Sequence, residues 1–158
     1  MKFVCTLITV TDMHRSRTFY ESVLGQRVKH DFGENVQFEG GFAIHLRSHF
    51  STLIGDVPVD PPGNGSELYF ESDDIDTIIP RLETEEVTFV HPLREQPWRQ
   101  KVVRFHDPDG YMVEVGESLS ALVRRLAGEG LTVEMIRDAT GMTAEFISGI
   151  LNSDHHTR

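Results

Sequence analysis

A carboxylate stands in the middle of a strand-like stretch at the start of the last third of the chain. The stretch HDPDGYMVEV, residues 106–115, opens with Asp, Pro and Gly in their preferred turn positions. The residues after the turn alternate like a strand, which puts Glu114 on the face opposite Val113 and Val115. A carboxylate in this place can bind a metal or transfer a proton, or it can pair with a basic residue on a neighbouring strand.

Other polar side chains are expected on the same face of the strands as Glu114. They are Cys5, His45, Glu67, Tyr69, Arg104 and His106. The alternate positions of these strands are apolar and are expected to carry helices. An antiparallel sheet can leave such a polar face in water, but a sheet that curls around it makes a cleft with convergent polar groups, the usual form of a ligand site.

The elements that would position these residues occur twice along the chain. A strand at 3–10 is followed by a helix at 13–24, and a strand at 67–72 is followed by a helix at 75–84 that Pro80 should kink or shorten. Three further strands follow each helix, at 26–32, 35–40 and 42–47 and then at 87–92, 101–107 and 111–117. The repeat predicts an α+β fold of two βαβββ modules.

The modules should occupy about residues 1–54 and 67–117, joined by a linker rich in Pro and Gly, and together they form one domain, 1–117. Residues 118–158 are expected to form two or three short helices, broken at 128–130 and at Gly141. The last residues, SDHHTR, are expected to be frayed.

The helical tail has the rhythm of a helix-turn-helix around Gly141. Its second helix, TAEFISGILN, contains no Arg or Lys, although contacts to phosphates and bases need such donors. We therefore expect the tail to pack on its own domain or on a second copy in a homodimer, and we do not expect it to bind DNA.

Composition limits the possible functions further. A net charge of −10 over 158 residues argues against a general binder of nucleic acids or anionic membranes. No apolar run approaches the length of a membrane span. The single cysteine, Cys5, allows no internal disulfide, so a reducing compartment fits and a cytoplasmic location is expected.

Three motifs, in this order, identify a family resemblance. TVTDMHRSRTFYESVLG, ELYFESDDID and DPDGYMVEV resemble those of the vicinal oxygen chelate superfamily, also called the glyoxalase/bleomycin resistance/dioxygenase superfamily. The resemblance covers about residues 1–117. It implies that the two modules form a curved, U-shaped mixed sheet around a divalent metal.

The metal ligands of this superfamily come from the first and last strands of each module. The matching positions here are Cys5, His45, Glu67 and Glu114, and the metal could be Zn, Ni, Mn or Fe. The set departs from the usual pattern at two positions. The common ligand is His, Gln or Glu at the position of Cys5, and it is often His at the position of Glu67. The two-His, one-carboxylate triad of iron dioxygenases is absent from the expected positions. A specific activity therefore does not carry over.

A basic stretch in this acidic chain is the expected rim of the cleft. LREQPWRQKVVR, residues 93–104, places Trp98 among basic residues that include Arg99 and Arg104. With Tyr69 and His106 these residues could bind an anionic or aromatic small molecule. Alternatively, the stretch is a solvated strand edge, with Trp98 covering the core.

Three functions follow from these observations. The first is a metal-dependent lyase, isomerase or transferase for a substrate with adjacent oxygens, with Glu114 and Glu67 as catalytic residues. The second is a non-catalytic protein that binds or sequesters a small molecule, such as a drug. The third is a ligand-sensing regulator that uses the helical tail.

Overall fold

The computed structural model describes residues 1–153, so most of the SDHHTR stretch that was expected to be frayed lies outside the described residues. The chain divides into two compact units. The first unit holds residues 1–67, 80–88 and 106–112, and the second holds residues 68–79, 89–105 and those from 113 onward.

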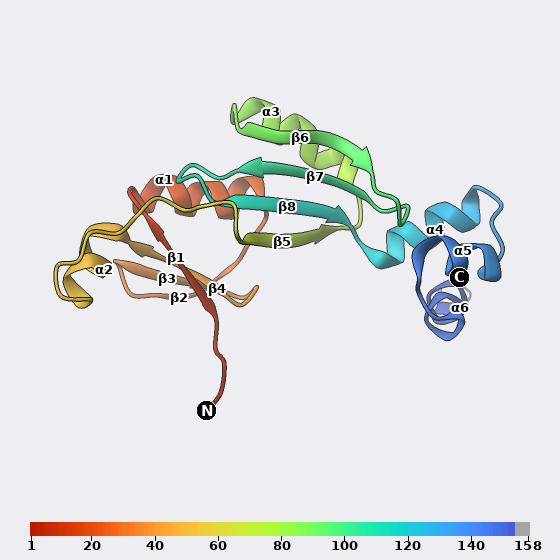
Figure 1. Cartoon of the computed structure of the whole chain (residues 1–158), viewed down its shortest axis with the longest axis horizontal. Coiled ribbons are helices and arrows are strands. Elements are labelled where there is room, and N and C mark those ends of the chain that lie inside the picture. Colours follow the sequence, from red (N-terminus) through yellow and green to blue (C-terminus); the bar gives the residue numbers. More distant parts are fainter. Residues whose placement is uncertain (154–158) are drawn as a thin grey trace. The chain divides into compact units, whose positions relative to one another are not determined.

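The first unit contains a four-stranded mixed sheet (Figure 1). Its strands are β1 Thr6–Val10, β2 Val28–Asp31, β3 Asn35–Phe38 and β4 Phe42–Leu46. They lie in the order β1-β4-β3-β2, with β1 and β4 parallel and the other pairs antiparallel. Because β1 begins at Thr6, Cys5 lies just before this strand, although the sequence predicted a strand over residues 3–10.

Helix α1, Met13–Thr18, begins where the sequence predicts but ends before the predicted residue 24. The side chain of Asp12 accepts a hydrogen bond from the backbone N–H of Arg15 at 3.0 Å, which caps the first turn. A π-helical segment, Phe19–Val23, continues the helix, and Gly25 then takes a positive φ of 64° that a residue with a β-carbon rarely adopts.

Aromatic packing fixes the π-helical segment that continues α1 on the first sheet. The buried ring of Tyr20 lies 5.8 Å from that of Phe38 and 5.0 Å from that of Phe42, measured between ring centroids. The Tyr20 hydroxyl donates a 2.6 Å hydrogen bond to Asp107, in the turn DPDG. Asp109 of the same turn accepts a 2.6 Å bond from the hydroxyl of Ser16, on α1. The turn found in the sequence thus also anchors the first helix.

The sequence did not predict helix α2, Arg47–Leu53, which directly follows β4. Its residues have no apolar periodicity, and no side chain caps its first turn. A hydrogen bond of 2.7 Å from the Ser51 hydroxyl to the carbonyl of Val57 joins α2 to the chain that follows. As a result, His49 and Phe50 lie on a helix and not in a loop.

The second sheet repeats the strand order of the first. It consists of β5 Glu67–Ser72, β6 Thr88–Glu95, β7 Lys101–His106 and β8 Met112–Glu117. The order is β5-β8-β7-β6, and the arrows of β5 and β8 point the same way while that of β7 points the opposite way (Figure 1). The predicted α+β fold with a repeated βαβββ unit is therefore confirmed.

The helix predicted at 75–84 is divided into a 3₁₀ turn, Ile75–Thr77, and helix α3, Ile78–Thr84. Pro80 lies in the first turn of α3, where a missing backbone N–H costs little. Ile75, Ile78 and Leu82 are buried, as their helical spacing predicts.

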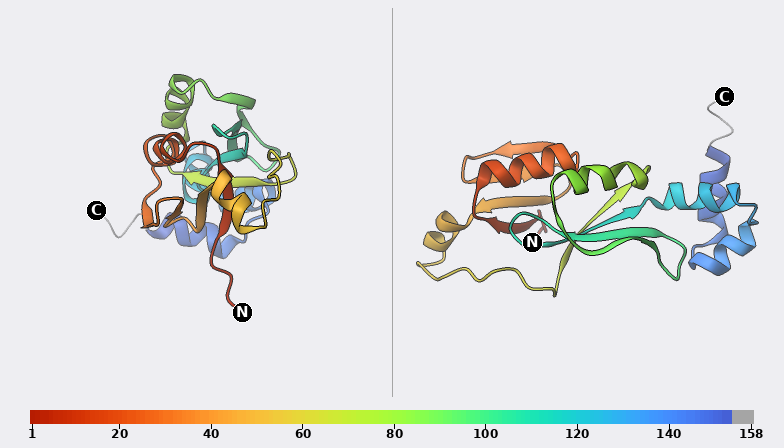
Figure 2. Two further views of the ribbon diagram at one scale, coloured as in Figure 1. Left: turned by 90° about the vertical axis from the view of Figure 1, so that its left-hand side faces the viewer. Right: turned by 90° about the horizontal axis from the view of Figure 1, so that it is seen from above.

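Three helices follow β8 within the described residues (Figure 2). They share one apolar core. They are α4 Leu119–Gly128, α5 Val133–Thr140 and α6 Ala144–Ser153. Leu122 and Leu126 of α4 are fully buried with Ile136 of α5 and Ile147 of α6. Gly141, between α5 and α6, has a φ of +76°, so the predicted break lies where a left-handed residue ends a helix. Within residues 1–153 no helix has the length and apolar character needed to cross a membrane.

Candidate functional site

Glu114 has the basic partner that strand pairing allows. Its side chain is only 5% exposed, and Arg104 on the neighbouring strand β7 forms an ion pair with it. Arg104 Nη1 also lies 3.3 Å from Nε2 of His91, on β6. A mid-strand carboxylate that is nearly buried needs such a partner, because desolvation of an unpaired charge costs several kcal/mol.

A hydrogen-bonded bridge links two exposed aromatic side chains on the second unit. Trp98 Nε1 donates to Oε1 of Gln100 at 3.0 Å, and Nε2 of Gln100 donates to the Tyr69 hydroxyl at 3.0 Å. Trp98 and Tyr69 are 45% and 48% exposed, whereas Gln100 is 5% exposed. A buried amide therefore holds both aromatic rings at the surface.

Gly116 makes room for this bridge. A β-carbon at Gly116 would lie 2.9 Å from Nε2 of Gln100 and 3.0 Å from the Tyr69 hydroxyl. Real β-carbons essentially never come so close to other atoms, so only glycine allows Gln100 and Tyr69 to meet over β8.

The Tyr69 hydroxyl stays protonated at neutral pH. Burial raises its pKa, the hydrogen bond received from Gln100 opposes that change, and the bond donated to Glu71 at 3.0 Å raises the pKa again. By strand alternation, Tyr69, Gln100, Arg104 and Glu114 share one face. We call these four residues, with Trp98 at their edge, the polar face of the second sheet.

His45 belongs to a separate polar cluster in the first unit. Its Nδ1 lies 3.0 Å from the Asn35 amide nitrogen, and its Nε2 lies 2.9 Å from Nδ1 of His49. Asn35 donates to Nδ1, so neutral His45 carries its proton on Nε2 and donates it to His49. Burial and the nearby His49 lower the pKa of His45, while Glu34 has the opposite effect, so His45 is neutral at pH 7.

The remaining predicted site residues have different surroundings. Cys5 is half-buried, and Glu67 is exposed at the start of β5, beside Met112 in a small recess. Arg99 forms ion pairs with Glu95 at 2.7 Å and Glu129 at 3.0 Å. The positive charge of Arg99 is therefore balanced by two carboxylates of the same chain.

Two of the four predicted metal ligands, His45 and Glu114, already have protein partners. Both ring nitrogens of His45 are in hydrogen bonds, and the guanidinium of Arg104 lies against the Glu114 carboxylate. A cation on that carboxylate would face the positive charge of Arg104 at short range. In the described part of the chain, no group of three or more His, Cys, Asp or Glu side chains is placed to hold a metal ion. This arrangement does not fit a metal, and the four ligands remain predictions from the resemblance.

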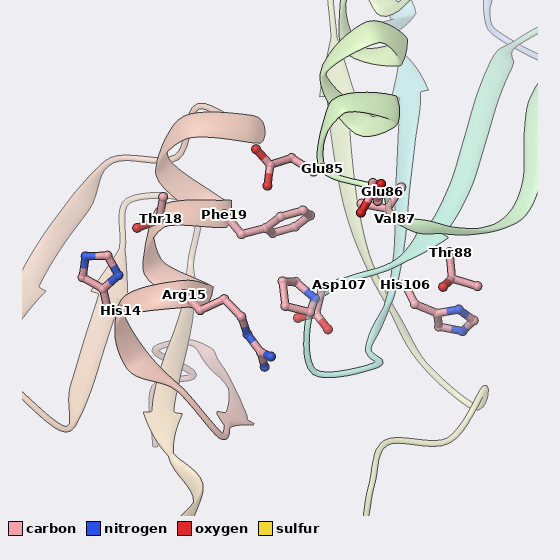
Figure 3. A pocket seen from close by; sticks show the side chains of 11 residues that line it. His14, Arg15, Thr18, Phe19, Glu85, Glu86, Val87, Thr88, His106 and Asp107 are labelled. Carbon is pink, nitrogen blue, oxygen red and sulfur yellow. The ribbon is translucent and has the colours of Figure 1, made fainter.

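His106, predicted to bind substrate, lines a pocket of the first unit instead (Figure 3). The pocket has a volume of about 520 Å³, within the usual range for small ligands. Phe19 points into it from the end of α1, and Glu85 and Glu86 border it on the other side. Its mixed polar and apolar walls make it a second candidate binding position.

Asp107 also borders this pocket, and it has a structural use. It is 5% exposed and accepts hydrogen bonds from Tyr20 and from the backbone N–H groups of Asp109 and Tyr111. Burial raises the pKa of the Asp107 carboxyl, although these three bonds lower it. Burial and the nearby Asp107 likewise raise the pKa of Tyr20 well above its usual value.

Sequence analysis missed two residues that shape the polar face. Gln100 lies four residues before Arg104, so strand alternation would place both on one face. It precedes the first residue of β7, however, and was not predicted as part of the site. His91 is on β6, and only the sheet order brings it beside Arg104.

Comparison with known proteins supports the superfamily resemblance. The glyoxalase-like domain family matches residues 3–120. A protein of unknown function from Agrobacterium tumefaciens is 40% identical, with 75% of this chain and 95% of that chain covered and a TM-score of 0.69. No curated protein matches significantly.

Two further solved structures share the fold at lower identity. A lactoylglutathione lyase from Agrobacterium tumefaciens is 24% identical, with 74% of this chain and 93% of that one covered and a TM-score of 0.57. A glyoxalase/bleomycin resistance protein/dioxygenase family enzyme from Burkholderia phytofirmans is 14% identical, with 75% and 100% covered and a TM-score of 0.66. With its repeated βαβββ unit and this match over residues 3–120, the chain belongs to the glyoxalase-like domain family of the vicinal oxygen chelate superfamily.

Proposed function

We propose that this protein binds an aromatic small molecule with adjacent oxygen atoms on the polar face of the second sheet. The observation that carries the proposal is the bridge from Trp98 through Gln100 to Tyr69. Rings held in this way offer stacking area and lose little conformational entropy when a ligand binds.

The charged side chains near the bridge determine which charge the polar part of the ligand can carry. Arg104 is the cationic side chain of the polar face, and its charge would attract the ligand's oxygens. Glu114 neutralises that charge in part, which favours a ligand with at most one negative charge. A single aromatic ring with a carboxylate and two hydroxyl groups has these properties.

A lyase or isomerase reaction on the same face is a second candidate function. The observation that favours it is the position of Glu114, a carboxylate that is 5% exposed in the middle of β8. In an isomerisation, Glu114 would accept a proton from the carbon beside a ligand carbonyl and return it to the neighbouring atom. Arg104 would keep the carboxylate ionised between these steps. Glu67, the other predicted catalytic residue, is exposed at the start of β5 and has no role in this proposal.

Metal dependence is the form of the activity that the superfamily resemblance predicts. A metal could bind Glu114 only after Arg104 had moved away from the carboxylate. Element analysis of protein purified without a His-tag or chelator tests this form directly. A stoichiometric metal that is lost from Glu114→Gln would contradict the arrangement proposed here and support the metal enzyme.

Binding of 3,4-dihydroxybenzoate, measured by calorimetry, tests the binding proposal. We expect Trp98→Phe and Tyr69→Phe each to weaken binding about tenfold, equivalent to about 1.4 kcal/mol. His106→Ala, which alters the pocket of Figure 3, is the control and should leave the affinity unchanged. If His106→Ala weakens binding and the other two variants do not, the ligand lies in that pocket and the proposal is wrong.

A further inference from the structure

An ion-pair network joins the C-terminal helices to the loop that carries Trp98. Arg125, on α4, donates from Nε and Nη2 to the two carboxylate oxygens of Glu117, both at 2.9 Å. Glu117 is 4% exposed, and the side chain of Arg125 is 21% exposed. A two-point bond to a buried carboxylate is among the stronger ion pairs in proteins, unlike a solvated surface pair. This bond raises the pKa of Arg125 further above its usual value.

The same guanidinium reaches the backbone of the loop. Nη2 of Arg125 donates to the carbonyl oxygen of Arg99 at 2.6 Å. Arg99 has a φ of +71°, a left-handed conformation that is unfavourable for a residue with a β-carbon. The hydrogen bond from Arg125 therefore adds to the loop's own backbone bonds, from Gln96 N–H to Gln100 and from Arg99 N–H to Gln96, in holding this conformation.

Two acidic side chains connect Arg99 and Arg125. Glu129 accepts from Arg99 at 3.0 Å and from Arg125 at 2.8 Å. Glu95 does the same, at 2.7 Å and 3.2 Å. The hydrogen bond from Arg125 lowers the pKa of Glu129, so this carboxylate is ionised at neutral pH.

The network ends at the bridge of the polar face. Trp98 and Gln100 are the two chain neighbours of Arg99, and Gln100 also donates to the carbonyl oxygen of Glu117 at 2.8 Å. The Glu117 carboxylate therefore accepts from Arg125 and, at 3.3 Å, from the backbone N–H of Lys101, while its carbonyl oxygen accepts from Gln100. Any movement of α4 would disturb both the loop and the amide that fixes Trp98 and Tyr69.

We propose that Arg125 is a positioning residue, through which the C-terminal helices hold Trp98 and Gln100 in the geometry that binds the ligand. Arg125 lies beyond residue 120, where the family match ends, so this control is an addition to the shared domain. The effect on affinity rests on the function proposed above. The position of the loop does not, and it can be measured without a ligand.

The chain contains a single tryptophan, so its fluorescence reports on Trp98 alone. In Arg125→Ala we expect Trp98 emission to shift to longer wavelength and acrylamide quenching to rise, because the loop opens to solvent. Affinity for 3,4-dihydroxybenzoate should fall about tenfold. Arg125→Lys keeps the charge but not the two-point geometry, so its fluorescence should lie between those of the wild type and Arg125→Ala.

Arg137→Ala is the matched control, because it removes the same charge from α5 outside the network. It should leave Trp98 fluorescence unchanged. If Arg125→Ala does not fold, Glu129→Gln supplies the test, since it weakens the connection to Arg99 and leaves the Glu117 bonds in place.

The outcomes separate the two proposals. Unchanged Trp98 emission and quenching in a folded Arg125 or Glu129 variant overturns the positioning role, even if the wild type binds the probe. A changed Trp98 signal in a protein that never binds 3,4-dihydroxybenzoate supports the positioning role and counts against the proposed function.

Discussion

Arg104 on β7 and Glu114 on β8 form an ion pair across neighbouring strands of the second sheet. Strand alternation predicted that Glu114 faces away from Val113 and Val115, and pairing with a basic residue on a neighbouring strand was one of its expected uses. The pair explains how a carboxylate can be 5% exposed in the middle of a strand.

Loss of the Glu114 charge should destabilise the fold. Glu114→Gln keeps the shape of the side chain but leaves the guanidinium of Arg104, 23% exposed, without its counter-charge. We expect the free energy of unfolding in urea at neutral pH to fall by about 1–3 kcal/mol. Glu83→Gln, at an exposed position on α3, is the control and should change it by less than about 0.5 kcal/mol. Equal stability of the two variants would show that the ion pair contributes nothing measurable.

Gly116→Ala should break the aromatic bridge. The added β-carbon would overlap Gln100 and the Tyr69 hydroxyl, so their hydrogen bond must open. We expect weaker binding of 3,4-dihydroxybenzoate and a changed Trp98 emission spectrum. Gly149→Ala is the control: its β-carbon meets nothing within 4 Å, and helix propensity should stabilise α6 by about 0.5–1 kcal/mol. Unaltered emission in Gly116→Ala would mean that the bridge does not depend on this glycine.

Acid should destabilise the protein through His45. Burial lowers the pKa of His45 in the folded chain, so the unfolded chain takes up its proton first, near a pH of about 6.5. The unfolded state then binds more protons, and the free energy of unfolding falls as the pH drops from about 6.5 to below the folded pKa. The stabilising effect of neutral His45 is complete above that window.

Urea unfolding at a series of pH values measures this dependence. In His45→Asn the free energy of unfolding should depend less on pH below about 6.5 than in the wild type. His30→Asn, at an exposed position on β2, should keep the pH dependence of the wild type. A wild-type slope in His45→Asn would assign the acid sensitivity to another group.

The C-terminal helices should support a homodimer and should not bind DNA. Helix α6 contains no Lys or Arg, and α5 contains one, Arg137. We expect light scattering to show a dimer for the full chain, and truncation after Ser118 to lower the oligomeric state or the melting temperature. A sequence-specific shift of DNA at low salt that truncation abolishes would support a regulator instead.

The repeated module could be predicted from sequence because its signals are local. Alternating apolar residues, the Asp12 cap and the left-handed glycines Gly25 and Gly141 each act within a few residues. The same alternation predicted which face of β8 holds Glu114. The helix α2 was missed because the stretch Arg47–Leu53 has no apolar periodicity, so nothing local distinguishes it from a loop.

Tertiary structure alone decided how the charged residues are used. From sequence, Arg99 looked available to a ligand, yet its partner Glu129 lies 30 residues away, and Arg125, which bonds to its carbonyl, lies 26 residues away. Likewise, the sequence predicts His45 as a metal ligand, whereas in the folded chain Asn35 and His49 form hydrogen bonds with both of its ring nitrogens. Composition and periodicity define which residues share a face, but an ion pair or hydrogen bond requires two side chains within about 3 Å, and only the folded chain sets that distance.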